Sequence, residues 1–333
     1  MSLADESTDE SGGLKSKVLL ENLDHPCGVA VRPLSAGELF VAESGAGRVL
    51  RVRLNEPPES AVAIEGFPLA QVGAGVNHSL GPLAVAFVDR TTLVVGDGGE
   101  PKGADALRVY QLPDDGKTLA FDKSKFTLRA PSPQGSAASE EDFFAIAATS
   151  TTLFAASSGN GAAGWIFKAE VAGLTSPVLR GFVETTRETG ASAPRAIDLN
   201  KRGELVVAQA GDFGTKKDSV VCFYHAASGK RLLRLDAELY DIVGLAFSKF
   251  GLLYAIDYAA ADPSAGGLFR LDMDVRGGRQ AIKAVKLLSL DRPVGLAIPS
   301  DRELYVTTFG RSDGANGGKT GRLLKIEKTD DNF

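Results

Sequence analysis

Acidic side chains recur at equivalent places along this chain, and converging carboxylates are groups that could hold a cation or exchange protons. Glu43, Asp97 and Asp257 each end a run of apolar residues, whereas Asp142 and Asp241 each precede one. Oxygen ligands of this kind suit a calcium-like ion when they converge. The chemistry therefore depends on whether the fold brings these positions together.

The apolar runs beside these acids belong to a sequence repeat. Each repeat carries a small residue at the same place, and these residues lie 56, 61, 51, 48 and 51 positions apart. They are Gly28, Ala84, Ala145, Ala196, Gly244 and Gly295, which we call the landmark residues. One repeat of this size cannot bury its own apolar face, so it must stack on its neighbours. The period predicts a propeller or another repeat array.

Each repeat has the pattern of several short antiparallel strands. An almost wholly apolar run such as VGLAF is followed by a short polar turn, a second run such as LLYAID and a third such as GLFRLDM. We expect the first run to be packed on both faces. A fourth run precedes the next repeat, most clearly at 231–239 and 283–290. Four strands per repeat form a propeller blade, so we predict an all-β, six-bladed β-propeller with four-stranded antiparallel blades.

The two ends of the chain predict how the ring closes. After residue 328 the sixth repeat has only TDDNF left and lacks a fourth strand. KSKVLLENLDHPCG at 15–28 matches KAVKLLSLDRPVG at 283–295, so residues 15–23 are expected to complete the last blade. We predict a single propeller over residues 15–328, a disordered acidic lead at 1–14 and a short tail at 329–333.

In a propeller, the end of the second strand and the start of the innermost strand lie on one face, around the mouth of the central channel. We predict a ligand site at this mouth, with Asp241 and Asp257 as a candidate calcium-binding pair because hairpin pairing brings them together. The alternative is that the acids at strand ends accept hydrogen bonds from turn amides. The candidate site residues are His25, Glu43, Asp97, Asp142, Arg195, Gln209, Asp241, Asp257 and Arg292.

The pattern PCGVAV, a short turn, LFVAESG and then RVLRV resembles the NHL-repeat type of six-bladed propeller. More widely, it is similar to the superfamily that holds the SMP-30/gluconolactonase and strictosidine synthase-like proteins. The resemblance covers residues 15–328 and implies the propeller fold. It does not imply one function, because lactonases, other hydrolases, dehydrogenases and binding modules share this fold.

Two enzymatic interpretations follow from the resemblance. SMP-30-like enzymes hold a divalent cation partly through Asn or Asp immediately before the inner-strand glycine. Here the residues before the six landmarks are Cys27, Leu83, Phe144, Arg195, Val243 and Val294, which departs from that pattern. LDHPCGVAV is also loosely similar to the start of quinoprotein sugar dehydrogenases, in which His25, Arg195 and Arg292 would be the set around the quinone.

Composition limits the partners. The net charge is −5 with a pI of 5.4, so a sequence-independent grip on nucleic acid or on anionic lipid is not expected. The sequence has no apolar run of about 18 residues to span a bilayer. Cys27 and Cys222 fall on opposite sides of the predicted ring, so we expect no disulfide. We expect a monomer that is secreted or periplasmic, with a cytoplasmic location left open.

The sequence thus favours a propeller that binds a small molecule, or an extended peptide or protein, on its loop-rich face without catalysis. The alternative is a metal-dependent hydrolase of the SMP-30/lactonase type. A divalent cation such as calcium would be its cofactor.

Overall fold

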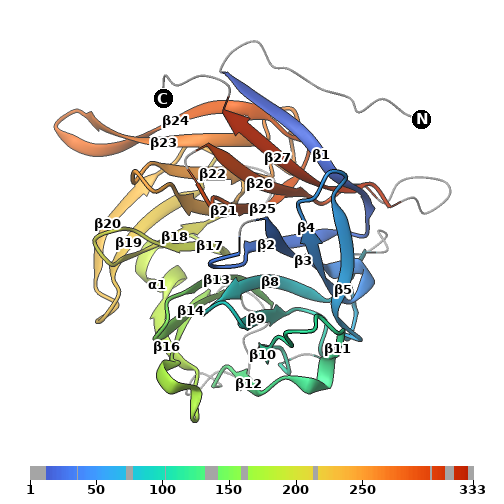
Figure 1. Cartoon of the computed structure of the whole chain (residues 1–333). Helices are drawn as coiled ribbons and strands as arrows, with labels where there is room; N and C mark the ends of the chain where they lie inside the picture. Colours follow the sequence, from blue (N-terminus) through green and yellow to red (C-terminus); the bar gives the residue numbers. More distant parts are fainter. Residues whose placement is uncertain are drawn as a thin grey trace.

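The computed structural model describes residues 13–35, 37–72, 78–101, 103–131, 142–158, 164–212, 217–300, 302–311 and 319–328. Six antiparallel sheets are arranged radially around a central channel, as Figure 1 shows. The predicted six-bladed β-propeller is therefore confirmed. Residues 1–12 of the expected lead and the expected tail at 329–333 lie outside the described residues. The part of the chain that the structure describes contains no helix with the length and hydropathy of a transmembrane span.

The strands of blades 1 to 5 run outward from the channel in chain order, and blade 6 takes its outer strand from the start of the chain. Blade 1 comprises β2 (Pro26–Val31), β3 (Glu38–Glu43), β4 (Arg48–Arg53) and β5 (Glu59–Glu65). Blade 2 comprises β8 (Pro82–Phe87), β9 (Thr92–Asp97), β10 (Ala106–Gln111) and β12 (Phe126–Arg129). Blade 3 comprises β13 (Phe143–Ala148), β14 (Thr152–Ser157), β15 (Trp165–Glu170) and β16 (Arg180–Glu184).

The second half of the ring repeats this order. Blade 4 comprises β17 (Pro194–Leu199), β18 (Glu204–Gln209), β19 (Val220–His225) and β20 (Arg231–Asp236). Blade 5 comprises β21 (Ile242–Phe247), β22 (Leu253–Asp257), β23 (Gly267–Arg276) and β24 (Arg279–Ser289). Blade 6 comprises β25 (Pro293–Ala297), β26 (Glu303–Thr308), β27 (Gly321–Lys328) and β1 (Leu14–Leu23).

Smaller elements lie outside this pattern. A short strand, β11 (Leu119–Ala120), pairs in parallel with β5 at the outer edge of blade 1. A two-stranded ribbon of β6 (Ala70–Val72) and β7 (His78–Leu80) connects blades 1 and 2, and one helical turn, α1 (Thr185–Thr189), follows blade 3.

The N-terminal strand closes the ring, as predicted. β1 pairs antiparallel with β27, in a register that runs from Leu14 opposite Lys328 to Leu23 opposite Gly321. Leu14 and Leu23 are buried. Leu14 packs with residues of blades 5 and 6, whereas Leu23 packs with residues of blades 1 and 6. A segment from the start of the chain thus joins the last blade to the first.

In every blade but the second, the second strand is more buried than the first, and in blade 2 both β8 and β9 are buried at every residue. β3, β9 and β22 are buried at every residue, because each lies between the neighbouring strands of its own sheet and the two adjacent blades. The inner strands β13 and β17 keep several half-buried residues, because one side faces the channel. The prediction that the inner strands are packed on both faces was therefore wrong for these strands.

Both cysteines are free, as expected. Cys222 is buried in β19 of blade 4, and Cys27 lies in β2 of blade 1.

Candidate functional site

A cavity of about 310 Å³ lies at the mouth, where the inner strands begin. All six residues that precede the landmark residues line it, so each blade contributes one side chain to its wall. We call these side chains the mouth ring: Cys27, Leu83, Phe144, Arg195, Val243 and Val294. Leu80, Asp142, Tyr258 and Phe309 complete the lining. The cavity adjoins the central channel, because Phe144, Val243 and Val294 line both.

Arg195 is the charged member of the mouth ring. It is the second residue of β17, and its guanidinium carbon lies 3.4 Å from the centroid of the Phe144 ring. Burial lowers the pKa of Arg195 to about 10, while the charges of Asp142 and Asp241 oppose this shift. Arg195 therefore stays protonated at neutral pH and is held flat against an aromatic wall.

Asp142 brings the opposite charge to the same cavity. It directly precedes β13 and has a positive φ of 58°, a conformation that aspartate tolerates better than most residues. Its backbone N–H donates to Asp105 Oδ2 at 3.1 Å, which anchors the turn to blade 2. The cavity thus offers one cation and one carboxylate against mainly apolar side chains.

The remaining wall is aromatic or neutral. Phe309 packs between His25, with ring centroids 4.6 Å apart, and Tyr258, with centroids 6.5 Å apart. Burial raises the pKa of the Cys27 thiol to about 12, so Cys27 is protonated at neutral pH and is a poor nucleophile. Burial also raises the pKa of Tyr258, although the charge of Arg292 opposes the shift.

The predicted acids at strand ends make contacts within or beside their own blades. Asp257 accepts backbone N–H bonds from Tyr240 at 3.0 Å, Asp241 at 2.7 Å and Ala259 at 3.2 Å. Asp241 accepts one from Ala260 at 2.7 Å. Asp241 and Asp257 are therefore neighbours, as expected, and their oxygens hold turn amides. These contacts favour the alternative interpretation for this pair, in which acids at strand ends accept hydrogen bonds from turn amides.

The same kind of contact occurs at the other strand ends. Glu43 Oε1 accepts the N–H of Asp24 at 2.8 Å, and Glu43 Oε2 pairs with Arg48 Nε at 2.5 Å. Gln209 accepts a hydrogen bond from Thr189 at 2.9 Å and donates to the carbonyl of Ala191.

Asp97 is buried in blade 2, where its Oδ2 pairs with Arg108 Nε at 2.7 Å. Burial raises the pKa of Asp97 to about 7; Arg108 opposes this shift, and Asp105 and Glu100 add to it.

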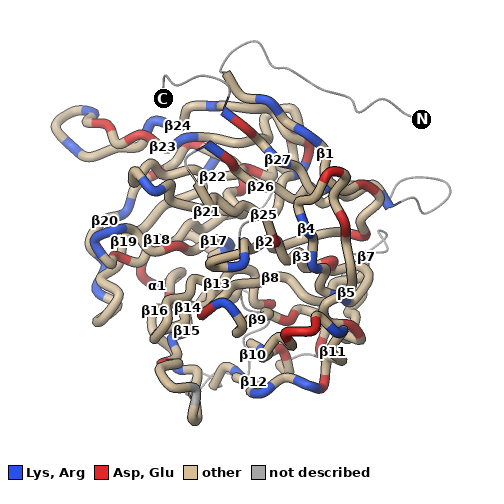
Figure 2. Tube along the Cα trace, viewed as in Figure 1, with Lys and Arg blue, Asp and Glu red and all other residues tan. Residues whose placement is uncertain are grey.

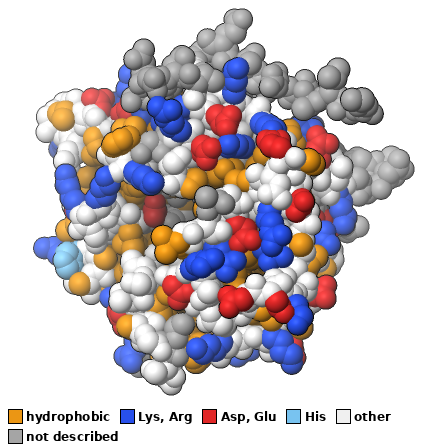
Figure 3. Space-filling view, in the orientation of Figure 1, with side chains coloured by type: hydrophobic (Ala, Val, Ile, Leu, Met, Phe, Trp, Pro, Cys, Tyr) orange, Lys and Arg blue, Asp and Glu red, His pale blue; other side chains and the backbone are white. Residues whose placement is uncertain are grey.

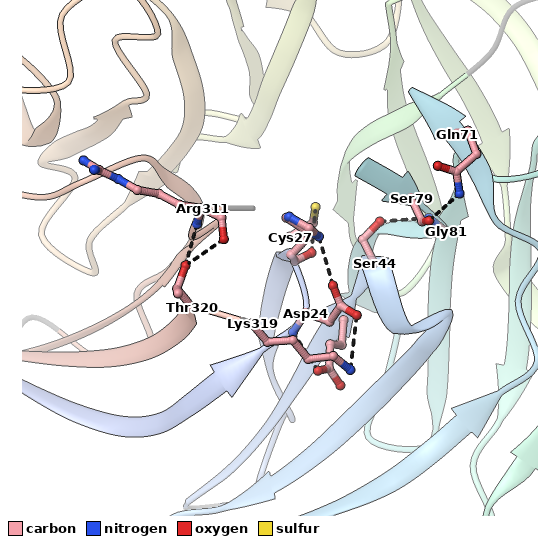
Figure 4. A network of polar contacts seen from close by, with 11 residues as sticks. Asp24, Cys27, Ser44, Gln71, Ser79, Gly81, Arg311, Lys319 and Thr320 are labelled. Atoms are coloured by element: carbon pink, nitrogen blue, oxygen red, sulfur yellow. Dashed lines mark hydrogen bonds and ion pairs between the residues drawn. The ribbon is translucent and has the colours of Figure 1, made fainter. Parts of the chain in front are cut away.

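Polar contacts along one rim of the mouth join blades 6, 1 and 2 (Figure 4). Asp24 Oδ2 pairs with Lys319 Nζ at 3.2 Å, and Asp24 Oδ1 lies 2.9 Å from His25 Nδ1. Ser44 Oγ accepts the N–H of Gly81 at 2.9 Å. His25 and Arg292 precede the inner strands β2 and β25 and, like Asp142, have positive φ.

Of the nine predicted site residues, Asp142 and Arg195 line the cavity. The other seven are not among its lining residues within the described part of the chain. That part also holds no group of three or more His, Cys, Asp or Glu side chains placed to bind a metal ion. Of the six mouth-ring residues, the sequence prediction named only Arg195 as a candidate, although the other five share its position before a landmark.

Comparisons with known proteins bear on the fold. No family model and no curated protein matches the chain. The putative oxidoreductase (glucose dehydrogenase) of Thermus thermophilus is 18% identical, with a TM-score of 0.61 over 94% of this chain and 100% of that one. The PQQ-bound aldose sugar dehydrogenase of Streptomyces coelicolor is 15% identical, with a TM-score of 0.60 over 94% of this chain and 98% of that one.

A gluconolactonase of Xanthomonas campestris is 11% identical, with a TM-score of 0.57 over 98% of this chain and 95% of that one. This chain has the fold of those six-bladed propellers. The resemblance predicted from the repeats is confirmed at the level of the fold. Because this fold hosts many functions, we infer the function of this protein from the side chains at the mouth.

Proposed function

We propose that this protein binds a small organic acid in the mouth cavity, with Arg195 as the group that recognises the carboxylate. The observation that carries the proposal is one guanidinium, stacked on Phe144, in a ring of otherwise uncharged side chains. A cation in such surroundings attracts an anion more strongly than it would in water. The planar guanidinium also matches a carboxylate through two parallel hydrogen bonds.

The size and lining of the cavity narrow the class of ligand. A volume of about 310 Å³ is at the small end of known ligand sites, which favours a small molecule over an extended peptide. Leu83, Val243 and Val294 offer contacts to an apolar body, and Asp142 offers an acceptor for a ligand hydroxyl. These features fit a hydroxylated or aromatic acid.

Binding is tested by calorimetric titration with gluconate and phenylacetate, each beside its neutral amide. We expect at least one acid to bind and its amide to bind at least tenfold more weakly. Arg195→Gln should raise the Kd of that acid at least tenfold, which corresponds to about 1.4 kcal/mol. Arg187→Gln is the matched control, because Arg187 is exposed and outside the cavity. Equal affinity of the wild type and Arg195→Gln would refute the assignment.

Lactone hydrolysis is the second candidate function. It is supported by the similarity to a structure described as a gluconolactonase and by the presence of both Asp142 and Arg195 in the wall of one cavity. Metal analysis of the purified protein and a pH-stat assay with gluconolactone, with and without chelator, separate the two candidates. One tightly held divalent ion together with chelator-sensitive ring opening would favour the hydrolase.

A further inference from the structure

A second hollow lies between blades 4 and 5, away from the mouth. It has a volume of about 870 Å³ and shares no lining residue with the mouth cavity. The turns 200–203 and 248–251, together with strands β19, β20, β23 and β24, build it. We call it the blade 4–5 groove. Its floor is apolar and includes Phe223, Leu233, Phe247, Leu271 and Ile282.

Large hydrophobic side chains are exposed along this groove. Phe250 is 81% exposed, Met273 54% and Leu232 47%, and all three line it. Val275, 68% exposed, follows Met273 on β23. These four are the majority of the seven large hydrophobic residues that are exposed in the described ranges. A concentration of apolar surface of this kind marks an interaction site.

The strands and turns around the groove are basic, in contrast to the chain as a whole, whereas the charged residues that line it directly are Lys201, Arg202, Glu204 and Asp272. The segments 200–204, 230–238, 248–251 and 270–283 contain ten lysines and arginines and five acidic residues, a local net charge of +5. The whole chain has a net charge of −5. Basic positions follow β20 and its neighbouring turns in Figure 2, and in Figure 3 basic side chains adjoin hydrophobic ones over the same blades.

Four of these five acids pair with arginines, whereas the fifth, Glu204, accepts a hydrogen bond from Asn200 Nδ2 at 2.6 Å. Asp272 accepts two hydrogen bonds from Arg270, at 2.6 and 2.9 Å. Asp274 and Glu238 both pair with Arg276. In contrast, Lys201, Arg202 and Lys249 form no ion pair within the described residues, and Glu204 is the one acid in the segments 200–204 and 248–251 that carry them. Their charge is therefore available to a partner.

We propose that the blade 4–5 groove binds an acidic peptide segment of a partner protein, in which Asp or Glu alternates with large apolar side chains. The apolar side chains would enter the groove, and the acids would meet Lys201, Arg202 and Lys249 at its rim. A second copy of this chain is disfavoured, because a two-fold contact would place like charges against each other. A flat bilayer surface is disfavoured because the apolar residues line a concave groove.

The proposal is tested with a fluorescent pool of short peptides in which Glu or Asp alternates with Leu or Phe. We expect anisotropy to report saturable binding that weakens with salt. A pool with Lys in place of the acids should bind at least tenfold more weakly. Lys201→Glu/Arg202→Glu and, separately, Phe250→Ser should each reduce affinity at least tenfold. The matched control is Lys117→Glu/Lys123→Glu, which reverses two exposed lysines of blade 2 and should leave affinity unchanged.

Three outcomes would overturn the proposal. Equal binding by the wild type and both groove variants would place the peptide elsewhere. Binding to vesicles that contain anionic lipid, without binding to the acidic pool, would assign the surface to a membrane. Concentration-dependent dimerisation abolished by Phe250→Ser, without peptide binding, would assign it to a second copy. Circular dichroism of each variant confirms that the fold is retained. The organic-acid titration measures binding at the mouth cavity, which is a different site. A negative result for the peptide therefore leaves the proposed function untouched, and the reverse also holds.

Discussion

Adding one methyl group at Gly295 should loosen the joint between the last blade and the first. Gly295 lies in β25, and a Cβ built there would be 2.3 Å from the carbonyl oxygen of Cys27 and 2.5 Å from Thr307 Oγ1. It would also be 3.2 Å from the backbone nitrogen of Val29. Cys27 and Val29 belong to β2 of blade 1, so the clash falls on backbone across the ring closure.

The expected cost can be worked from these contacts. Ordinary contacts of a Cβ begin near 3.4 Å, so blades 1 and 6 must separate locally by about 1 Å. Overpacking of this kind costs about 1–3 kcal/mol. The hydrogen bond that Thr307 donates to the Cys27 carbonyl lies at the same place, and its loss adds about 1 kcal/mol. We expect Gly295→Ala to lower the free energy of unfolding by about 3 kcal/mol.

Calorimetry and urea unfolding measure this loss. At about 2 °C per kcal/mol for a chain of this size, Tm should fall by roughly 6 °C. Gly28→Ala is the graded comparison, because its Cβ would meet the Ala84 and Leu83 backbone at 2.9 Å and needs a smaller shift. The reasoning fails if Gly295→Ala melts with the wild type or if Gly28→Ala is the more damaging change.

Three further predictions address closure, charge and capping. Leu23→Ala should lower the free energy of unfolding, measured in urea, by about 2–5 kcal/mol, because Leu23 is buried between blades 6 and 1. The control Leu34→Ala, at a side chain that is 95% exposed, should change it by no more than about 0.5 kcal/mol. Burial raises the pKa of Asp97 in the folded protein to about 7, whereas an unfolded Asp titrates near pH 4. The neutral carboxyl therefore adds to the free energy of unfolding below about pH 4, and this contribution is lost as pH rises to 7. Relative to the wild type, Asp97→Asn should therefore gain about 4 kcal/mol of unfolding free energy between about pH 4 and 7. A difference that does not vary with pH would contradict this. Asp257→Asn should lower the free energy of unfolding by about 2 kcal/mol with or without added calcium, because it weakens three hydrogen bonds from backbone N–H groups. A loss of stability seen only with calcium would instead support an ion site.

The fold could be predicted because its constraints repeat in the sequence. The six landmark residues are small, and at Gly28, Gly244 and Gly295 a side chain would meet atoms already in place. The closing strand could be predicted because residues 15–28 match residues 283–295, the equivalent segment of blade 5 and the start of blade 6. Such signals survive in one sequence because each blade meets the same packing problem.

The roles of the acids could not be read from spacing alone. Asp257 was predicted as a possible ion ligand, but its oxygens accept N–H groups from Tyr240 and Asp241, which lie on the turn into β21. A carboxylate at a strand end has the same sequence signature whether it faces a cation or a turn. The blade 4–5 groove was hidden for a different reason, since a local charge of +5 is masked by an overall charge of −5.

The mouth ring lies directly beside the residues that set the packing between blades. Gly28 and Gly295 are held small by backbone atoms of the neighbouring blade, whereas the residue before each landmark lines the cavity. In this chain those positions carry Cys, Leu, Phe, Arg and two Val, so five of the six are uncharged and one is a guanidinium. Leu83 is buried, and Cys27 and Val243 pack against hydrophobic clusters, so an exchange at those positions would change the packing as well as the chemistry of the mouth. Specificity in this molecule is therefore expected to depend on Arg195 and its Phe144 support, one residue away from the positions that fix the fold.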